Sequence, residues 1–323
     1  MSRIDEALRR AAAQSRGTAI ASDSIPEPAG HDNVAVLAGE PFPADTGSSV
    51  SETPVAVNAA PQGRHDVFAE VGRPRTQPAP ARESLFERMD SRLAEKVVVD
   101  RDMQPASREQ YRRLAAVLHD AQGTDGVRVV MLASAVSGEG KTLTAANLAL
   151  TISESYQRRV LLIDADLRKP ALHNIFKLDT ASGLSEGLKS GGAAKLVVRQ
   201  ISDHLWLLPA GRPNSDPMAG LTSERMQLLI KEASETFDWV IIDTPPLVIL
   251  PDANLLASMV DAAVLVVRAD STPHHLVKRA ADAIGHKRVL GVVLNQAQVT
   301  HLPYGGYYDD YYFAGSAEES ERS

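Results

Sequence analysis

The sequence has no cysteine among its 323 residues. Disulfides, thiolate nucleophiles and cysteine metal sites are therefore excluded, and the chain suits a reducing compartment. It also lacks any apolar run of about 18 residues, the length that suggests a membrane-spanning helix. The formal net charge of -7 argues against a general binder of nucleic acid, which needs a basic surface. We expect a cytoplasmic protein without a nucleic-acid partner.

Aromatic residues are scarce, and the tyrosines are unevenly spread. Aromatics make up 5% of the chain, and most of its 7 tyrosines fall within residues 304–312. Glycines and aspartates interrupt this segment, so it has no regular amphipathic pattern and makes a poor core element. One interpretation is a sticky tail that packs on a neighbour. The other is a set of phosphate acceptors, namely Tyr304, Tyr307, Tyr308, Tyr311 and Tyr312.

The composition divides the chain into four parts. Residues 1–20 have the spacing of a short amphipathic helix, and residues 21–95 are rich in proline, alanine and serine and should form a disordered linker. Residues 96–300 should form the folded domain, and residues 301–323 a flexible tail. The opening helix either docks on a partner or frays by itself, because so short a helix is marginal in water.

A glycine-containing turn lies between an apolar strand and a helix rich in alanine and leucine. From Ala135 to Thr142 its spacing is that of a P-loop, whose backbone N–H groups surround a phosphate at a helix N-terminus. Lys141 is the candidate contact for the β- and γ-phosphates, and Thr142 for Mg²⁺. The other candidate nucleotide contacts in the loop are Ser137, Gly138, Glu139, Gly140 and Leu143. The alternative is a plain glycine-rich turn with an exposed lysine.

Two further buried strands end in carboxylates. One leads into Asp164-Ala165-Asp166-Leu167-Arg168, and the other ends at Asp243, before Thr244-Pro245-Pro246. Ligands of open α/β sheets bind at the carboxyl ends of the strands, so these acids should face the P-loop ligand. Asp243 has the form of a Walker B acid that holds Mg²⁺, and a turn-capping aspartate is the alternative. Asn295, after the last predicted strand, either meets a nucleotide base or is a turn residue.

Strands and helices alternate through the folded domain. Apolar runs predict strands around 129–134, 160–163, 205–208, 239–242, 263–267 and 289–294, with helical stretches between them. Ahead of these, a capping box at Ser107 and Gln110 predicts a helix whose apolar face includes Leu114 and Leu118. This alternation predicts an α/β fold of the P-loop NTPase class, with a mostly parallel sheet flanked by helices.

The motifs, in this order, resemble those of bacterial tyrosine autokinases of capsule and exopolysaccharide synthesis, often called BY-kinases. The resemblance covers roughly residues 107–313. It rests on 138–142 as Walker A, 164–168 as the second acidic motif, 241–246 as Walker B, and the tyrosine cluster. The fold that it implies is that of MinD- and ParA-like P-loop ATPases.

The resemblance implies an activity and the residues that carry it. The reaction is ATP-dependent transfer of phosphate to tyrosines of the C-terminal cluster, with ATP and Mg²⁺ as cofactors. The implied catalytic residues are Lys141, Asp164, Asp166 and Asp243. The implied metal site is Thr142, Asp164, Asp166 and Asp243, and Arg168 and Asn295 join the loop residues as nucleotide contacts. One of the paired aspartates, Asp164 in our assignment, receives the tyrosine proton.

The resemblance also implies partners. Members of the family assemble as homo-oligomers, and those without membrane spans work with a membrane-embedded regulator of polysaccharide chain length. Such a partner would activate this chain and recruit it to the inner face of the plasma membrane. The family's oligomerisation helix carries Glu-x-x-Arg-x-x-Arg, which Glu109 and Arg112 match, whereas Ala115 takes the third position. The opening residues 2–8 are similar to those of members from exosortase-linked clusters.

Two other functions fit the same fold. A MinD- or ParA-like ATPase switches partners around ATP and phosphorylates nothing. Those proteins carry a second lysine in the P-loop, where this chain has Val136. A non-enzymatic nucleotide-sensing scaffold is the other alternative, and it requires that Asp164 or Asp166 be dispensable.

Overall fold

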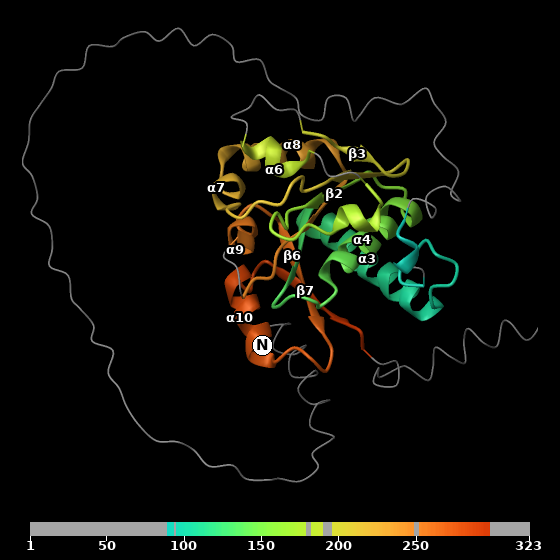
Figure 1. Cartoon of the computed structure of the whole chain (residues 1–323). Coiled ribbons are helices and arrows are strands. Elements are labelled where there is room, and N and C mark those ends of the chain that lie inside the picture. The colour runs from blue at the N-terminus through green and yellow to red at the C-terminus, as the bar shows by residue number, and fades with distance from the viewer. Residues whose placement is uncertain (1–88, 94, 179–181, 190–195, 249–251, 298–323) are drawn as a thin grey trace, which may run out of the picture. The chain divides into compact units, whose positions relative to one another are not determined.

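The sheet at the centre of the fold carries every site motif that precedes the tail. The computed structural model describes residues 89–93, 95–178, 182–189, 196–248 and 252–297 (Figure 1). Within them the strand order is β3-β4-β2-β5-β1-β6-β7. The strands are β1 Val129–Ser134, β2 Val160–Asp164, β3 Arg199–Gln200, β4 Leu205–Leu208, β5 Trp239–Asp243, β6 Ala262–Arg268 and β7 Val289–Asn295. Neighbouring strands are parallel except β3, which pairs antiparallel with β4 at one edge.

Helices cover both faces of this sheet. They are the short η2 Ser91–Leu93, α3 Pro105–Asp125, α4 Lys141–Ser155, α5 Leu172–Ile175, α6 Leu184–Lys189, α7 Met218–Leu221, α8 Glu224–Thr236, α9 Asp252–Ala257 and α10 His274–Ile284. One core lies between the sheet and α3, α4 and α5, and the other between the sheet and α6 to α10. The described residues therefore form three layers, with the sheet in the middle.

The strands are apolar on both faces because both faces are covered. In β1, Val129, Met131 and Ala133 belong to the core with α6 to α10, whereas Val130 and Leu132 belong to the core with α3 to α5. This alternation is the two-residue period of a strand, with both sets of side chains buried. The predicted P-loop class of α/β fold and the six predicted strands are confirmed. The two-residue strand β3 was not predicted, because so short an edge pairing leaves no pattern in the sequence.

Helix α3 begins earlier than predicted and without the predicted cap. Its first residue is Pro105 and its N-cap is Gln104, with no side-chain capping hydrogen bond, so the capping box at Ser107 is wrong. Proline at the first helical position explains the earlier start, because its missing N–H has no helical partner there anyway. The predicted apolar face is confirmed by Leu118, which is fully buried.

The segment before α3 is fixed to the core. Met89 is buried, and the side chain of Asn147 in α4 accepts from the N–H of Val98 at 3.0 Å and donates to the carbonyl of Lys96 at 2.8 Å. Met89, within the range predicted as linker, thus packs on the domain. The predicted helix at 1–20, most of the linker and the tyrosine tail lie outside the described residues. No helix within the described residues is both long enough and apolar enough to cross a membrane.

Candidate active site

The phosphate-binding loop connects β1 to α4. Gly138 and Gly140 have φ of 85° and 87°, in the left-handed region that favours glycine, and Gly140 is the N-cap of the helix that begins at Lys141. Ser137 and Gly138 are exposed at the turn. The 15-residue α4 directs the positive end of its dipole and its unpaired N–H groups at this loop. The local structure is therefore that of an anion-binding helix N-terminus.

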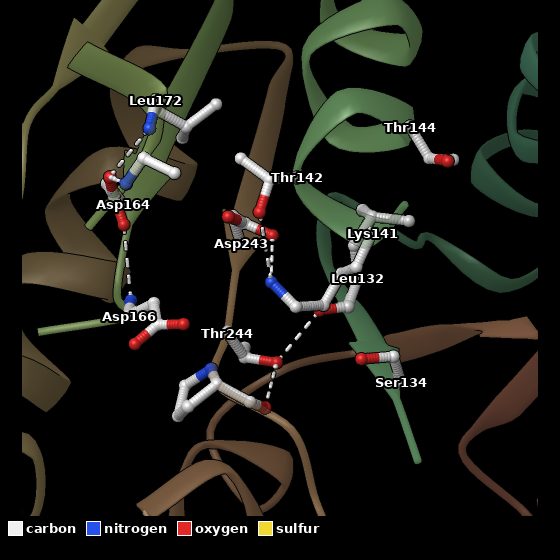
Figure 2. A network of polar contacts seen from close by, with 12 residues as sticks. Leu132, Ser134, Lys141, Thr142, Thr144, Asp164, Asp166, Leu172, Asp243 and Thr244 are labelled. Atoms are coloured by element: carbon white, nitrogen blue, oxygen red, sulfur yellow. Dashed lines mark hydrogen bonds and ion pairs between the residues drawn. The ribbon is translucent and has the colours of Figure 1, made fainter. Parts of the chain in front are cut away.

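Lys141 joins the loop to the carboxyl end of β5. Its ammonium forms a buried ion pair with Oδ1 of Asp243 and lies 3.5 Å from the hydroxyl of Thr142 (Figure 2). The side chains of Lys141 and Asp243 are only 6% and 1% exposed, so the pair is enclosed by protein. The structure thus brings together the lysine, the threonine and the Walker B aspartate that the motifs singled out.

Asp243 keeps one oxygen without a partner. Its Oδ2 is buried and accepts no hydrogen bond from the described residues. A buried carboxylate oxygen without a donor is costly, so a further positive group or donor is expected beside it. Among the described residues no group of three or more His, Asp or Glu side chains forms a complete metal site. An ion such as Mg²⁺, which protein often holds by one or two carboxylates together with phosphates and water, fits these residues.

Asp164 lies beside Asp243 and is held differently. The two aspartates are register partners at the carboxyl ends of β2 and β5. Oδ2 of Asp164 accepts from the N–H groups of Ala171 and Leu172 at 3.2 and 3.1 Å, and its Oδ1 accepts from the N–H of Asp166 at 3.3 Å (Figure 2). Asp164 is fully buried. Its carboxylate is therefore enclosed by backbone.

The two acids of the second motif differ in exposure and share the direction of their pKa shifts. Burial raises the pKa of Asp164 to about 8, and the charge of Asp243 adds to the rise, while the N–H of Leu172 and the charge of Lys141 oppose it. Burial also raises the pKa of Asp166, against an opposing hydrogen bond from the N–H of Lys169 at 3.0 Å. Asp166 is only partly buried. Of the two carboxylates, only that of Asp166 is partly exposed.

Four of the predicted nucleotide contacts also make contacts within the domain. Glu139 is 1% exposed and its carboxylate accepts from the N–H of Val136 at 2.8 Å, while Asn295 donates its side-chain N–H to the carbonyl of Glu139 at 2.8 Å. Leu143, in the first turn of α4, is partly buried against the core between the sheet and α3 to α5. Asn295 thus touches the loop itself, and its contact with a base stays a prediction. The guanidinium of Arg168 donates to the carbonyl of Ser215.

Two threonines make contacts that sequence reasoning did not predict. Thr244 is fully buried and donates its hydroxyl to the carbonyl of Leu132 at 2.8 Å, which joins the end of β5 to β1. Thr272 donates its hydroxyl to the carboxylate of Glu139. Thr244 follows the Walker B aspartate directly and could have been found from that position. Thr272 is far from every motif along the chain, so no local signal marks it.

Comparison with known proteins identifies similar sequences. The family profile described as "Cellulose biosynthesis protein BcsQ" matches residues 127–300. Tyrosine-protein kinase YwqD of Bacillus subtilis is 33% identical over 228 residues, which cover 69% of this chain and 96% of YwqD. Succinoglycan biosynthesis transport protein ExoP of Rhizobium meliloti is 32% identical over 238 residues, which cover 71% of this chain and 29% of ExoP.

A solved structure extends the similarity to three dimensions. The kinase domain of the Escherichia coli tyrosine kinase ETK aligns with a TM-score of 0.54 and 28% sequence identity, over 59% of this chain and 77% of that domain. The aligned share is consistent with the described α/β domain, since much of the remaining chain lies in residues 1–88 and 298–323. The similarity in sequence and the similarity in structure both point to tyrosine kinases.

Proposed function

The chain belongs to the bacterial tyrosine kinases of capsule and exopolysaccharide synthesis, and we propose that it transfers phosphate from Mg-ATP to tyrosines of its own C-terminal cluster. The protein is a protein-tyrosine kinase that binds a nucleotide together with a divalent metal. The observation that supports the proposal most is the meeting of Lys141, Thr142 and Asp243, with one buried Asp243 oxygen left without a donor. An anion-binding loop beside a carboxylate that has an oxygen without a donor suits a metal-bound nucleotide.

The residues of the site divide the work of phosphoryl transfer. The reaction passes through a loose transition state, so positioning and charge neutralisation matter more than a strong base. Lys141 and the N–H groups at the start of α4 would bind phosphate oxygens, and Thr142 and Asp243 would hold Mg²⁺, which would supply further positive charge. Lys141 would then exchange its ion pair with Asp243 for the phosphate.

Asp166 is better placed than Asp164 to receive the tyrosine proton. A base must come within hydrogen-bond distance of the hydroxyl that it deprotonates. Asp164 is fully buried and its oxygens already accept three backbone N–H groups, whereas Asp166 is partly exposed. We therefore revise the sequence-based assignment and propose Asp166 as the proton acceptor, with Asp164 fixing the turn that carries it.

The test of the proposed activity is a phosphorylation assay. Purified full-length chain, incubated with Mg-ATP, should gain phosphate on Tyr304, Tyr307, Tyr308, Tyr311 and Tyr312, as measured by intact mass and peptide analysis. A chain with these five tyrosines changed to phenylalanine is the matched control and should gain none. Hydrolysis of ATP without any tyrosine phosphate, even with the membrane partner added, would favour the ParA-like switch instead.

The tail reaches a neighbouring subunit in this proposal. Tyr304 to Tyr312 follow Asn295 closely enough for an extended reach of roughly 30 to 60 Å, which permits transfer within or between subunits. We favour transfer between subunits of a homo-oligomer. To test it, Lys141→Met chain with an intact tail is mixed with active chain truncated after Thr300. The inactive chain should gain phosphotyrosine, and its failure to do so contradicts transfer between subunits.

Phosphorylation should then weaken the assembly. Each phosphate adds about 1.5 to 2 negative charges, and several on a tail that carries Asp309 and Asp310 repel one another and the acidic site. Sedimentation of fully phosphorylated and dephosphorylated samples measures the effect. The same oligomer in both samples would contradict release by repulsion.

A separate membrane protein is the proposed activator. The chain matches under a third of ExoP, whose name describes a biosynthesis transport protein. We propose that a membrane-embedded regulator of polysaccharide chain length supplies what the rest of such longer relatives provides. It would recruit this chain to the inner face of the plasma membrane. Co-purification of the chain with membranes only when that regulator is expressed is the expected result.

A further inference from the structure

Glu139 is a buried charge inside the phosphate-binding loop. Its side chain is 1% exposed, and a buried carboxylate is tolerated only when donors or cations satisfy it. Its Oε2 accepts from the N–H of Val136 at 2.8 Å, and its Oε1 accepts from the hydroxyl of Thr272 and, at 3.4 Å, from the N–H of Arg268. The carboxylate therefore closes the loop on itself and ties it to the end of β6.

The same residue ties the loop to β7. The side-chain N–H of Asn295 donates to the Glu139 carbonyl at 2.8 Å, and a Cβ at Gly140 would collide with the Asn295 side chain. Strands β1, β6 and β7 are successive parallel strands of the sheet, so their carboxyl ends lie at one edge. Glu139 thus links three neighbouring strand ends behind the loop.

We propose that Thr272 is a positioning residue for nucleotide binding and acts through Glu139. The inference rests on the proposed function, because it concerns the same nucleotide. The Val136 N–H is taken by Glu139, which leaves the N–H groups from Ser137 onward for phosphate. A hydroxyl bond to a carboxylate is charge-assisted and stronger than a neutral one. By holding Glu139, Thr272 keeps the loop in shape and keeps a negative charge from turning toward the bound phosphates.

Among the described residues, the Thr272 hydroxyl makes no hydrogen bond other than the one to Glu139. The helix α10 that follows has Pro273 as its N-cap and no side-chain capping bond. The Thr272 backbone N–H donates to the carbonyl of Arg268 at 3.2 Å, which any residue but proline can do. The hydroxyl is therefore the group to test.

A double-mutant cycle tests whether Thr272 acts through Glu139. The variants are Thr272→Val, Thr272→Ser, Glu139→Ala and Thr272→Val combined with Glu139→Ala. The readout is the dissociation constant of a fluorescent ADP analogue with Mg²⁺, which does not depend on catalysis. Thr272→Val should weaken binding by about tenfold, and Thr272→Ser, which keeps the hydroxyl, by less than about twofold. In the Glu139→Ala background, Thr272→Val should have no further effect.

The control is Thr236→Val in α8, which removes a hydroxyl bond to the carbonyl of Glu232 far from the loop along the chain. It should leave nucleotide binding unchanged, and thermal unfolding confirms that each variant folds. Wild-type affinity in Thr272→Val, or an equal loss in the Glu139→Ala background, overturns the positioning role while leaving the kinase proposal intact. Absence of nucleotide binding in the wild-type chain overturns the proposed function itself.

Discussion

Asp164 and Asp243 occupy equivalent places and have opposite surroundings. Each is the last residue of a central parallel strand, each is fully buried, and they are register partners on neighbouring strands. Asp164 accepts three backbone N–H groups and has a raised pKa, whereas Asp243 pairs with Lys141 and keeps a buried oxygen without a partner. Backbone N–H groups bind both oxygens of Asp164, whereas one oxygen of Asp243 has no donor among the described residues and can bind a ligand.

The difference follows from the residues after each strand. After β2 the chain turns back, so that the N–H groups of Ala171 and Leu172, at the start of α5, reach Asp164. After β5 come Thr244, Pro245 and Pro246, and proline has no N–H to donate. The second and third residues after Asp243 therefore have no N–H to donate to it, whereas the N–H of Asp166, the second residue after Asp164, donates to Asp164. The Pro-Pro pair is a sequence feature that removes these two donors.

The largest expected effect comes from removing the positive charge of Lys141 beside these two aspartates. Lys141→Met leaves Asp243 and Asp164 side by side without their positive partner, and loss of one member of a buried ion pair typically costs about 3–5 kcal/mol. We expect a lower melting temperature, loss of nucleotide binding, and kinase activity reduced by about a thousandfold or more. Thermal unfolding, nucleotide titration and phosphotyrosine assays measure the three effects.

The exposed Lys231 in α8 supplies a control for that experiment. Lys231→Met makes the same chemical change on the surface and should leave all three measurements near wild type. If Lys141→Met kept wild-type phosphate transfer, the site would not depend on the buried ion pair, and the assignment of the P-loop lysine would be wrong.

Sequence reasoning located the ends of the strands better than it described their surroundings. Asp164 and Asp243 were found because buried apolar runs that end in aspartate are conspicuous, and the sheet class followed from the alternation of elements. Whether backbone N–H groups bind each carboxylate depends on how the following loop folds back. The sequence predicts this only in part. Pro245 and Pro246 lie next to Asp243 and show that two donors are missing, whereas the contacts of Asp164 with α5 depend on a turn several residues away.

The loop behind the phosphate site shows the same limit. The glycines of the P-loop were found because their spacing is a local pattern, and both have the positive φ that glycine allows. The contact of Glu139 with Thr272 joins residues that are 133 positions apart in sequence. Such a pair forms only when β1 and β6 lie side by side, so one sequence read along its length cannot reveal it.

A second experiment separates the role of the partly exposed Asp166 from those of the fully buried Asp164 and Asp243. Asp166→Asn keeps the size of the side chain and removes the proton acceptor, so kcat should fall by about 100- to 1,000-fold. Nucleotide affinity should fall far less, because the N–H groups of the loop remain. Turnover and ADP titration measure these separately. The exposed Asp282→Asn in α10 is the control, and wild-type turnover in Asp166→Asn would exclude it as the base.

The pH dependence of stability tests the raised pKa of Asp164. The folded-state pKa of Asp164 is raised to about 8, above its ordinary value of 3.8, so between about pH 4 and 8 the folded chain binds more protons than the unfolded chain. Stability of the metal-free protein should therefore be greatest at the acid end of this window and fall as pH rises. One such group contributes a slope of at most about 1.4 kcal/mol per pH unit.

Asp164→Asn should flatten this slope, because the amide does not titrate. Its nitrogen faces the N–H of Asp166 or those of α5, so the variant also loses an acceptor and about 1 kcal/mol at acid pH. Urea unfolding from pH 5 to 8 in the presence of a metal chelator measures both. An unchanged slope in Asp164→Asn would mean that another group, such as Asp166, carries the pH dependence.

The smallest expected effect comes from giving Asp243 the backbone donor that it lacks. Pro245→Ala introduces an N–H two residues after the aspartate, the spacing at which an aspartate side chain commonly accepts from its own backbone. If that N–H occupies Oδ2, Mg²⁺ must displace it, and the Mg²⁺ concentration for half-maximal activity should rise by about two- to tenfold, which corresponds to the net 0.5–1.5 kcal/mol of one hydrogen bond. Activity at saturating Mg²⁺ should stay near wild type.

Pro105→Ala, at the exposed start of α3, is the matched control, since both changes loosen the unfolded chain equally. An unchanged Mg²⁺ dependence in Pro245→Ala would show that something other than the missing N–H keeps Asp243 open.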